Sequence, residues 1–236
     1  MRMWMVLALA AVAAVAPARA EMLDDAWFAA VRVDQLEYRA GEDGNLAAWE
    51  LEASYGSDEW KLALESEAEY ALRPDEFETL ENRLVVRRMV SEFFDARAGL
   101  RFDTPHGPDR VYGLLGFEGL ARQWFEVDGD LFLSEKGDLS ARFGAEYDLL
   151  ITNRLFLQPV AEIDLAASDD RDIGQGQGVT GIELGLRLRY ELVDRSVAPY
   201  VGVHWEKKLG ETADIARAEG EDTDAARVVV GVKLLF

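Results

Sequence analysis

The carboxy-terminal stretch of the chain is ARVVVGVKLLF, residues Ala226–Phe236. From Val228 onward every second residue is apolar, and the series ends on the final Phe236. Alternation with a period of two places one set of side chains on a single face of a β-strand. The stretch therefore predicts a strand with a continuous apolar face, in a chain whose 45 acidic residues far outnumber its 25 basic residues.

The first twenty residues have the pattern of a secretory signal peptide. Arg2 provides a short basic start, an Ala-rich apolar run follows at 6–16, and Ala18-Arg19-Ala20 is an A-x-A cleavage signal. The apolar run is too short to span a bilayer as a helix, which needs about 20 residues. We therefore predict a cleaved signal peptide at 1–20.

The remaining chain divides into a short segment at 21–30 and one folded unit at 31–236. Its length suits a single domain. The sequence contains no Cys, so an exported chain must be stable without disulfides. The net charge of −20 argues against nucleic acid as a partner, because that binding depends on Lys and Arg.

The same alternation recurs along the folded unit, with LSARFGAEYDL at 139–149 as a clear case. Most of the alternating stretches have about ten residues, the length that a tilted strand needs to cross a bilayer. We predict twelve strands, near 31–39, 46–55, 59–70, 80–90, 94–103, 110–121, 123–133, 138–150, 154–166, 179–192, 198–208 and 226–236.

The predicted connections alternate between tight turns and a set that is mostly longer. The tight turns lie near 56–58, 91–92, 122, 152–153 and 193–196, and the second set lies at 40–45, 71–79, 104–109, 134–137, 167–178 and 209–225. Short turns at one end and longer loops at the other are typical of outer-membrane barrels. With an even number of strands, both termini end on the short-turn, periplasmic side.

The distribution of charge favours a barrel in lipid over a soluble sandwich, whose apolar face would point inward. The polar face of the strands carries charges of both signs, and the apolar face carries almost none. Aromatic rings at both ends of one apolar face, such as Trp60 and Tyr70, resemble the girdles at membrane interfaces. Ordinary aromatic packing in a soluble barrel is the alternative.

We therefore expect an all-β fold: a closed, antiparallel transmembrane β-barrel in contact with outer-membrane lipid. Closure satisfies every backbone N–H and C=O, which lipid cannot do. The terminal strand, with Phe236, Leu234 and Val232 on one face, resembles the carboxy-terminal assembly signal of bacterial outer-membrane barrels. We expect the barrel assembly machinery to read it.

The inward face of the predicted barrel is rich in carboxylates. They include an acidic cluster of Glu52, Glu65, Glu67, Glu126, Asp128, Glu146 and Glu162. One interpretation is a structural network of ion pairs with inward arginines that fills a narrow lumen. The other is a conduit or site for cations, because excess carboxylate raises the local cation concentration.

Two histidines are candidate metal ligands. His204 lies in VHWEKK on the same face as Glu206, and His106 lies in the predicted loop TPHGPD. Imidazole and carboxylate together can hold a divalent ion. We predict His204, Glu206 and His106 as ligands, with a hydrogen-bonded lumen histidine as the alternative. Soft ligands for Cu(I) are almost missing, since only Met22 and Met89 remain after cleavage.

Nucleophilic catalysis receives little support, because no Ser–His–acid motif is evident in the sequence. We predict that the protein is not an enzyme and uses no organic cofactor. A hydrolase at the outer rim, built on His106 with Asp103 and Asp109, is the alternative.

Several stretches closely resemble the copper-resistance protein B family of Gram-negative bacteria. They are DQLEYR at 34–39, the block at 93–167 that begins FFDARAGLRF, IELGLRLRYEL at 182–192, APYVGVHWEKKLG at 198–210 and ETADIARAEGED at 211–222. The resemblance implies an outer-membrane barrel that acts in copper homeostasis, with copper ions bound or passed and a periplasmic multicopper oxidase in the same pathway. Family members often carry a Met- and His-rich segment before the barrel, which we do not expect within residues 21–30.

The main functional hypothesis is therefore a non-enzymatic outer-membrane barrel for copper resistance, which binds or passes copper. A structural or porin-like barrel with no specific metal role is the second hypothesis.

Overall fold

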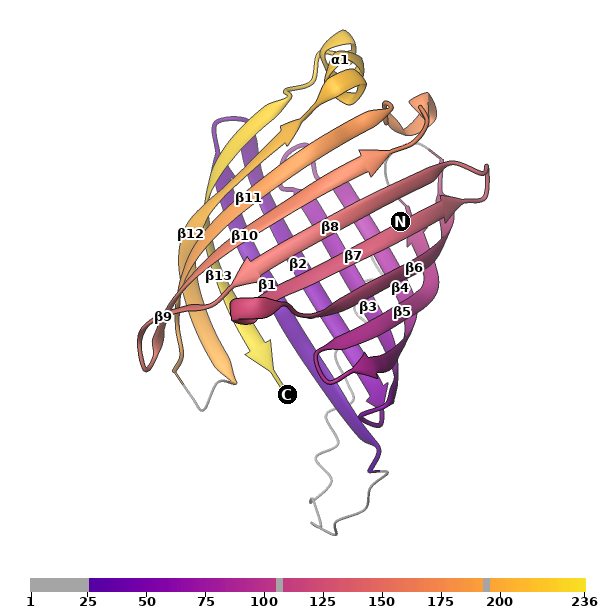
Figure 1. Ribbon diagram of the computed structural model, residues 1–236. Coiled ribbons are helices and arrows are strands. Elements are labelled where there is room, and N and C mark those ends of the chain that lie inside the picture. The colour runs from indigo at the N-terminus through magenta and orange to yellow at the C-terminus, as the bar shows by residue number, and fades with distance from the viewer. Residues whose placement is uncertain (1–25, 105–107, 193–195) are drawn as a thin grey trace, which may run out of the picture.

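The computed structural model describes residues 26–104, 108–192 and 196–236, whose β-segments form one antiparallel sheet of thirteen segments (Figure 1). The strands are β1 (Phe28–Gly41), β2 (Gly44–Gly56), β3 (Trp60–Ala71), β4 (Glu76–Ser91), β5 (Phe94–Asp103), β6 (Arg110–Leu120), β7 (Phe125–Ser134), β8 (Leu139–Tyr147), β9 (Leu149–Thr152), β10 (Leu155–Ala166), β11 (Gly178–Tyr190), β12 (Val197–Lys208) and β13 (Asp224–Leu235). One α-helix, α1 (Gly210–Glu219), and two short 3₁₀ turns, Arg122–Trp124 and Arg171–Ile173, lie in the connections.

The sheet closes on itself, so the described chain forms a barrel. β10 pairs with β8 and β9 on one side and with β11 on the other, and β13 pairs with both β12 and β1. The backbone N–H of Val31 donates to the carbonyl of Phe236 at 3.1 Å, and the N–H of Phe236 donates back at 2.9 Å. The last residue of the chain thus contributes to closure, which removes the exposed sheet edge.

The predicted strand at 138–150 is interrupted at Asp148, where β8 ends and β9 begins. Arg189 Nη2 donates to the Asp148 carboxylate at 2.5 Å, and the pairing with β10 shifts register just beyond, between Leu155 and Phe156. β8 and β9 follow one another along the same path and together cross the membrane once, so the barrel has twelve membrane-crossing strands. The predicted fold class is confirmed.

The strands extend further into the predicted loops than their composition indicates. β1 begins at Phe28, and its pairing with β2 continues to Gly41 opposite Gly44. The predicted loop at 40–45 is therefore a two-residue turn of Glu42 and Asp43, and Gly44, which begins β2, adopts a φ of 138°. The polar residues of this stretch suggested a loop, but polar strand ends can continue to pair through their backbones, as β1 and β2 do here.

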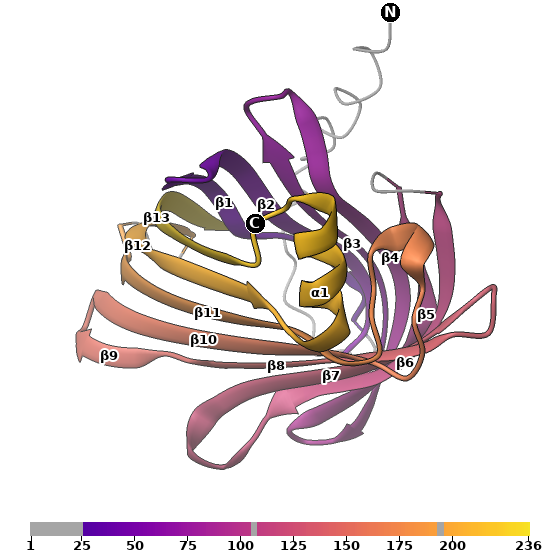
Figure 2. The same ribbon diagram turned by 90° about the horizontal axis from the view of Figure 1, so that it is seen from above.

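The predicted loop at 209–225 contains a helix, α1, that the alternation pattern does not predict. Helix α1 ends at Gly220, which has a left-handed φ of 84°, and the N–H of Glu221 donates to the carbonyl of Ala216. Seen from above, α1 lies over the mouth of the barrel (Figure 2).

The outward face is apolar and the inward face is charged. Outward side chains such as Leu115, Val228 and Val230 are 66%, 59% and 55% exposed, as expected for residues that face lipid. Arg88, which interrupts the apolar face of β4, places its guanidinium 5.0 Å from the ring centroid of Trp60, near the end of the barrel where β1 begins and β13 ends. No helix in the described ranges is long and apolar enough to cross a membrane.

Replacing Leu115 by Arg should test which face meets lipid, because Leu115 lies at the middle of β6 on the outward face. We expect Leu115→Arg to lower the free energy of unfolding in a phospholipid bilayer by about 2–4 kcal/mol. Leu133→Arg, near the end of β7, is the matched control and should cost only about 0–1 kcal/mol. Equal costs in a denaturant titration would contradict this orientation.

Candidate cation site in the barrel lumen

The lumen contains a continuous cavity of about 1660 Å³. Its lining includes Asp58 and Glu92 from turns at the end of the barrel where β13 finishes. It also includes Glu219 and Asp222 from the connection that carries α1, at the opposite end. The cavity therefore extends between the two ends of the barrel. All seven residues of the predicted acidic cluster, from Glu52 to Glu162, line it.

Strand pairing places carboxylates directly opposite one another in two rows on the inner wall. We call these the β10–β12 row, formed by Glu162, Glu183 and Glu206, and the β2–β5 row, formed by Glu50, Glu67, Glu81 and Asp103. Like charges directly opposite in a sheet are destabilising. The rows thus concentrate negative charge at a structural cost, as do the Asp and Glu rings of cation channels.

Arginines from β4, β5 and β8 neutralise part of this charge. Arg87 contacts Glu52 at 2.7 Å, Glu65 at 2.6 Å and Glu118 at 3.2 Å, and its side chain is only 8% exposed. Arg142 on β8 reaches across the lumen to Glu67 on β3, at 3.4 Å. The predicted ion-pair network is therefore present, and it leaves the cavity open beside it.

An apolar cluster also faces the lumen, although the alternation pattern predicts a charged inner face. Val85, Tyr112, Leu114 and Phe132 are buried together on the inner face of β4, β6 and β7. The Arg101 guanidinium lies 4.5 Å from the Phe132 ring centroid and 5.1 Å from that of Tyr112. One part of the inner wall therefore presents aromatic and aliphatic side chains and a stacked guanidinium, and the carboxylates beside it, Glu81 and Asp103, are already paired with Arg101 at 2.6 and 2.7 Å.

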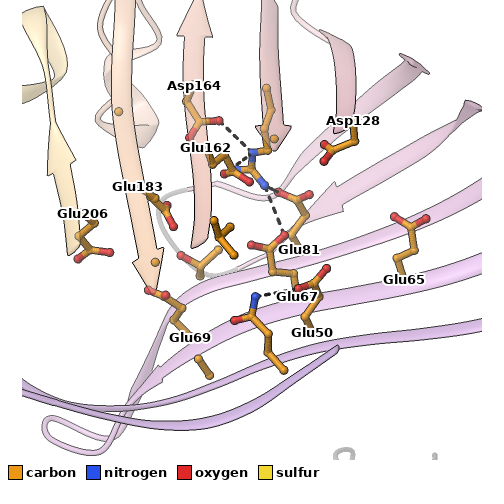
Figure 3. A pocket seen from close by; sticks show the side chains of 18 of the residues that line it. Glu50, Glu65, Glu67, Glu69, Glu81, Asp128, Glu162, Asp164, Glu183 and Glu206 are labelled. Carbon is orange, nitrogen blue, oxygen red and sulfur yellow. Dashed lines mark hydrogen bonds and ion pairs between the residues drawn. The ribbon is translucent and has the colours of Figure 1, made fainter. Parts of the chain in front are cut away.

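The predicted ligands His204 and Glu206 lie together on β12, and the structure adds Glu69 from β3. Potential ligand atoms of Glu69, His204 and Glu206 all lie within 4.8 Å of one another. Nε2 of His204 is 3.7 Å from Oε2 of Glu206 and 3.6 Å from Oε2 of Glu183 on β11. Figure 3 shows Glu69, Glu183 and Glu206 directed toward one another from three strands. His106 lies outside the described residues.

Glu69 and Glu183 were absent from the predicted ligand set, for different reasons. Glu183 lies directly opposite Glu206 in the β11–β12 pair, so the register of that hairpin was a usable signal. Glu69 lies on β3, which β13, β1 and β2 separate from β12 in the sheet. Its approach depends on the curvature of the closed wall, which a local sequence pattern does not encode.

A second group of carboxylates, Glu162, Asp164 and Glu183, lies beside the first. Arg142 already occupies it, since its Nε lies 2.9 Å from Asp164 Oδ1 and 3.1 Å from Glu162 Oε1. The guanidinium takes the position that a cation would need. This group is therefore a weaker candidate than the one around His204.

Ion pairs hold the connection between β10 and β11 over the barrel mouth. Arg110 contacts Asp170 at 3.0 Å, Lys136 contacts Asp172 at 2.8 Å, and the N–H of Gly176 donates to Thr212 Oγ1 on α1 at 2.9 Å. The hydrogen bond from Lys136 lowers the pKa of Asp172, so this contact persists under mildly acidic conditions. These contacts join two connections into a partial cover over the mouth.

The residues of the predicted assembly signal occupy the end of β13. Val232 and Leu234 are half-buried, Phe236 is 72% exposed, and β13 pairs with β1 to close the barrel. Recognition by the assembly machinery stays a prediction.

The closed barrel, its apolar outer face and its charged lumen define an outer-membrane β-barrel protein. Solved structures of two porins have a similar fold. The NanC porin gives a TM-score of 0.55 at 13% identity, covering 88% of this chain and 99% of its own. The KdgM porin gives a TM-score of 0.51 at 13% identity, with the same coverage.

Sequence comparison places the chain in one particular family of outer-membrane β-barrel proteins. The chain belongs to the copper resistance protein B precursor (CopB) family, whose family model matches residues 27–236. It is 38% identical over 206 residues to copper resistance protein B of Escherichia coli, covering 87% of this chain and 69% of that protein. It is 39% identical over 203 residues to a copper resistance protein B homolog of Pseudomonas syringae pv. tomato, covering 86% and 68%.

Removing Arg87 should show how far the lumen network stabilises the barrel. Arg87→Ala leaves Glu52, Glu65 and Glu118 without this buried partner, and we expect the free energy of unfolding to fall by about 1–3 kcal/mol. Arg32, 45% exposed and 2.9 Å from Glu52, is the matched control, and Arg32→Ala should cost about 0–1 kcal/mol. Urea unfolding in lipid vesicles measures both, and a similar loss in the two variants would argue against a stabilising network.

Proposed function

We propose that this chain acts in copper resistance at the outer membrane as a non-enzymatic barrel that draws copper ions into its lumen and binds or passes them. Membership of the copper resistance protein B family supports the pathway. The observation that carries the mechanism is the pair of carboxylate rows on the inner wall, β10–β12 and β2–β5.

The rows give the proposal a physical basis. Carboxylates that face a confined aqueous cavity raise the local concentration of cations and repel anions. The mouth adds further acid, since Asp43, Glu78 and Asp222 also line the cavity. A cation that enters from the α1 side would therefore meet negative charge first at the mouth and then along the wall.

The residues that would contact copper are His204 and Glu206, as the sequence predicts, and Glu69. His106 stays a predicted additional ligand at the outer rim. The chemistry of this set supports binding, because imidazole and carboxylate are both ligands for divalent copper. A periplasmic multicopper oxidase would be a partner in the pathway, and the barrel assembly machinery would insert the chain.

A porin-like barrel with no specific metal role is the second candidate function. The fold shared with the NanC and KdgM porins favours it, as does a cavity that extends between both ends of the barrel. The two candidate functions differ in the expected ion selectivity of the lumen: the copper barrel should prefer cations, and a general porin should not.

Deleting the gene should lower copper tolerance and change the copper content of the periplasm. The expected result follows from a barrel that handles copper at the outer membrane. Growth across a copper series, with metal analysis of the periplasmic fraction, measures both, and the plasmid-borne gene should restore them. Unchanged tolerance together with unchanged periplasmic copper would rule out the proposed function.

In planar bilayers, the purified mature chain should give a conductance that prefers cations. The reversal potential in a potassium chloride gradient should shift toward the potassium equilibrium potential, because carboxylate rows repel chloride. Replacing Glu67 and Glu183 by Gln should weaken that preference, while Glu59→Gln at an exposed turn should leave it unchanged. A wide, unselective pore would support the porin-like alternative, and no conductance would support a barrel that binds ions without passing them.

A further inference from the structure

The inner wall contains a buried nitrogen that has no partner. The side chain of His204 is only 5% exposed, and its Nε2 has no hydrogen-bond partner among the described residues. Buried polar atoms in folded proteins are nearly always hydrogen-bonded, so an exception calls for an explanation. The carboxylates of Glu183 and Glu206 face this nitrogen, and a carboxylate oxygen of Glu69 lies within 4.8 Å of a ring nitrogen of His204. We call these four residues the His204 pocket.

The separations in the His204 pocket suit ligands that share one metal ion. Nε2 lies 3.6 Å from Glu183 Oε2 and 3.7 Å from Glu206 Oε2, and both separations are too long for a hydrogen bond. Two ligands of one metal ion with bonds of about 2.0–2.2 Å lie about 3.3–3.6 Å apart in a tetrahedral site, and about 2.8–3.1 Å apart when adjacent in the square-planar arrangement typical of Cu(II). The observed separations are near the tetrahedral values, and the side chains would move together by less than about 1 Å to enclose Cu(II).

Two arginines orient the carboxylates of the pocket. Arg227 Nη1 donates to Glu206 Oε1 at 2.7 Å, which leaves Oε2 of that carboxylate directed toward His204. Arg39 Nη1 donates to Glu69 Oε1. Hydrogen bonds of this kind hold the ligands of metal sites in position. Arg227 contacts the oxygen of Glu206 other than the one that faces His204, in contrast to Arg142, whose Nε contacts two carboxylates of the neighbouring group.

The donor atoms select for one oxidation state of copper. One imidazole nitrogen and carboxylate oxygens suit Cu(II), which also has the highest affinity for such sites among the first-row divalent ions. Cu(I) prefers sulfur, and the chain has no Cys. Within the described ranges the single methionine is Met89, on β4 and outside the pocket.

We propose that the His204 pocket binds one Cu(II) ion through Nε2 of His204 and carboxylate oxygens of Glu69 and Glu206, with Glu183 as the fourth ligand. The identity of the metal rests on the proposed function in copper resistance. The proposal adds the ligands, the oxidation state and the position of the ion, against the β11–β12 wall of the lumen.

The test uses the full mature barrel, purified in detergent and shown to be folded by its heat-modifiable migration on gels. Cu(II) titration by calorimetry should give one site, and electron paramagnetic resonance should show coupling to one imidazole nitrogen. His204→Ala should weaken Cu(II) binding by at least ~10-fold and remove the nitrogen coupling. Glu69→Gln should weaken binding and keep the coupling, which separates loss of a ligand from loss of the fold.

Two further variants complete the design. Glu59→Gln removes one exposed carboxylate from the turn between β2 and β3, and it should leave binding unchanged. His106→Ala removes the other predicted histidine ligand, and the nitrogen coupling that His204→Ala abolishes should persist in this variant, because the two histidines would serve separate copper sites. Competition with Zn(II), and titration of Cu(I) under reducing conditions, should both give weaker binding than Cu(II).

The possible outcomes separate this proposal from the proposed function. Loss of the nitrogen coupling in His204→Ala, with copper tolerance of the cells unaffected by gene deletion, would support the pocket and overturn the function. A deletion that lowers tolerance, with Cu(II) binding unchanged in His204→Ala, would support the function and overturn the pocket. Coupling that disappears only in His106→Ala, or Cu(I) bound more tightly than Cu(II), would also overturn the pocket.

Discussion

The structure depends on one constraint, which is that hydrocarbon offers no hydrogen bonds to a polypeptide backbone. Every N–H and C=O within the membrane must find a partner inside the protein. A sheet meets this requirement only when it closes, and here the pairing of β13 with β1 closes it. Hydrocarbon also favours apolar side chains on the outer wall, so most of the ionised side chains within the membrane face the lumen.

The many acidic side chains confined to the lumen affect both the stability of the barrel and its interaction with ions. Cross-strand carboxylates such as Glu183 and Glu206 repel each other, and arginines such as Arg87 and Arg142 offset only part of that repulsion. A lumen that served packing alone would be better filled with matched charges or apolar side chains. The surplus negative charge, the acidic mouth and the unpartnered nitrogen of His204 together favour a wall shaped for cations.

The sequence predicted the barrel well because alternation reports directly on the two faces of a strand. Leu139 to Tyr147 and Val228 to Val232 lie in strands as expected, and the seven predicted acids line the cavity. Features set by long-range geometry were less accessible. The break at Asp148 accompanies a contact with Arg189, which is distant in the sequence, and the approach of Glu69 to His204 follows from the curvature of the wall. Helix α1 was missed because a search for alternation with a period of two does not detect a helix.

The aromatic and aliphatic side chains on the inner face of β4, β6 and β7 give the lumen two unlike sides. Around Tyr112 and Phe132 a hydrated ion would meet aromatic rings and the guanidinium of Arg101, which already pairs with the carboxylates of Glu81 and Asp103 at 2.6 and 2.7 Å. Along β10–β12 it finds carboxylates within reach. A cation that passes through the barrel would therefore stay close to the β10–β12 side, where carboxylates can replace its water ligands, and away from the inner face of β4, β6 and β7.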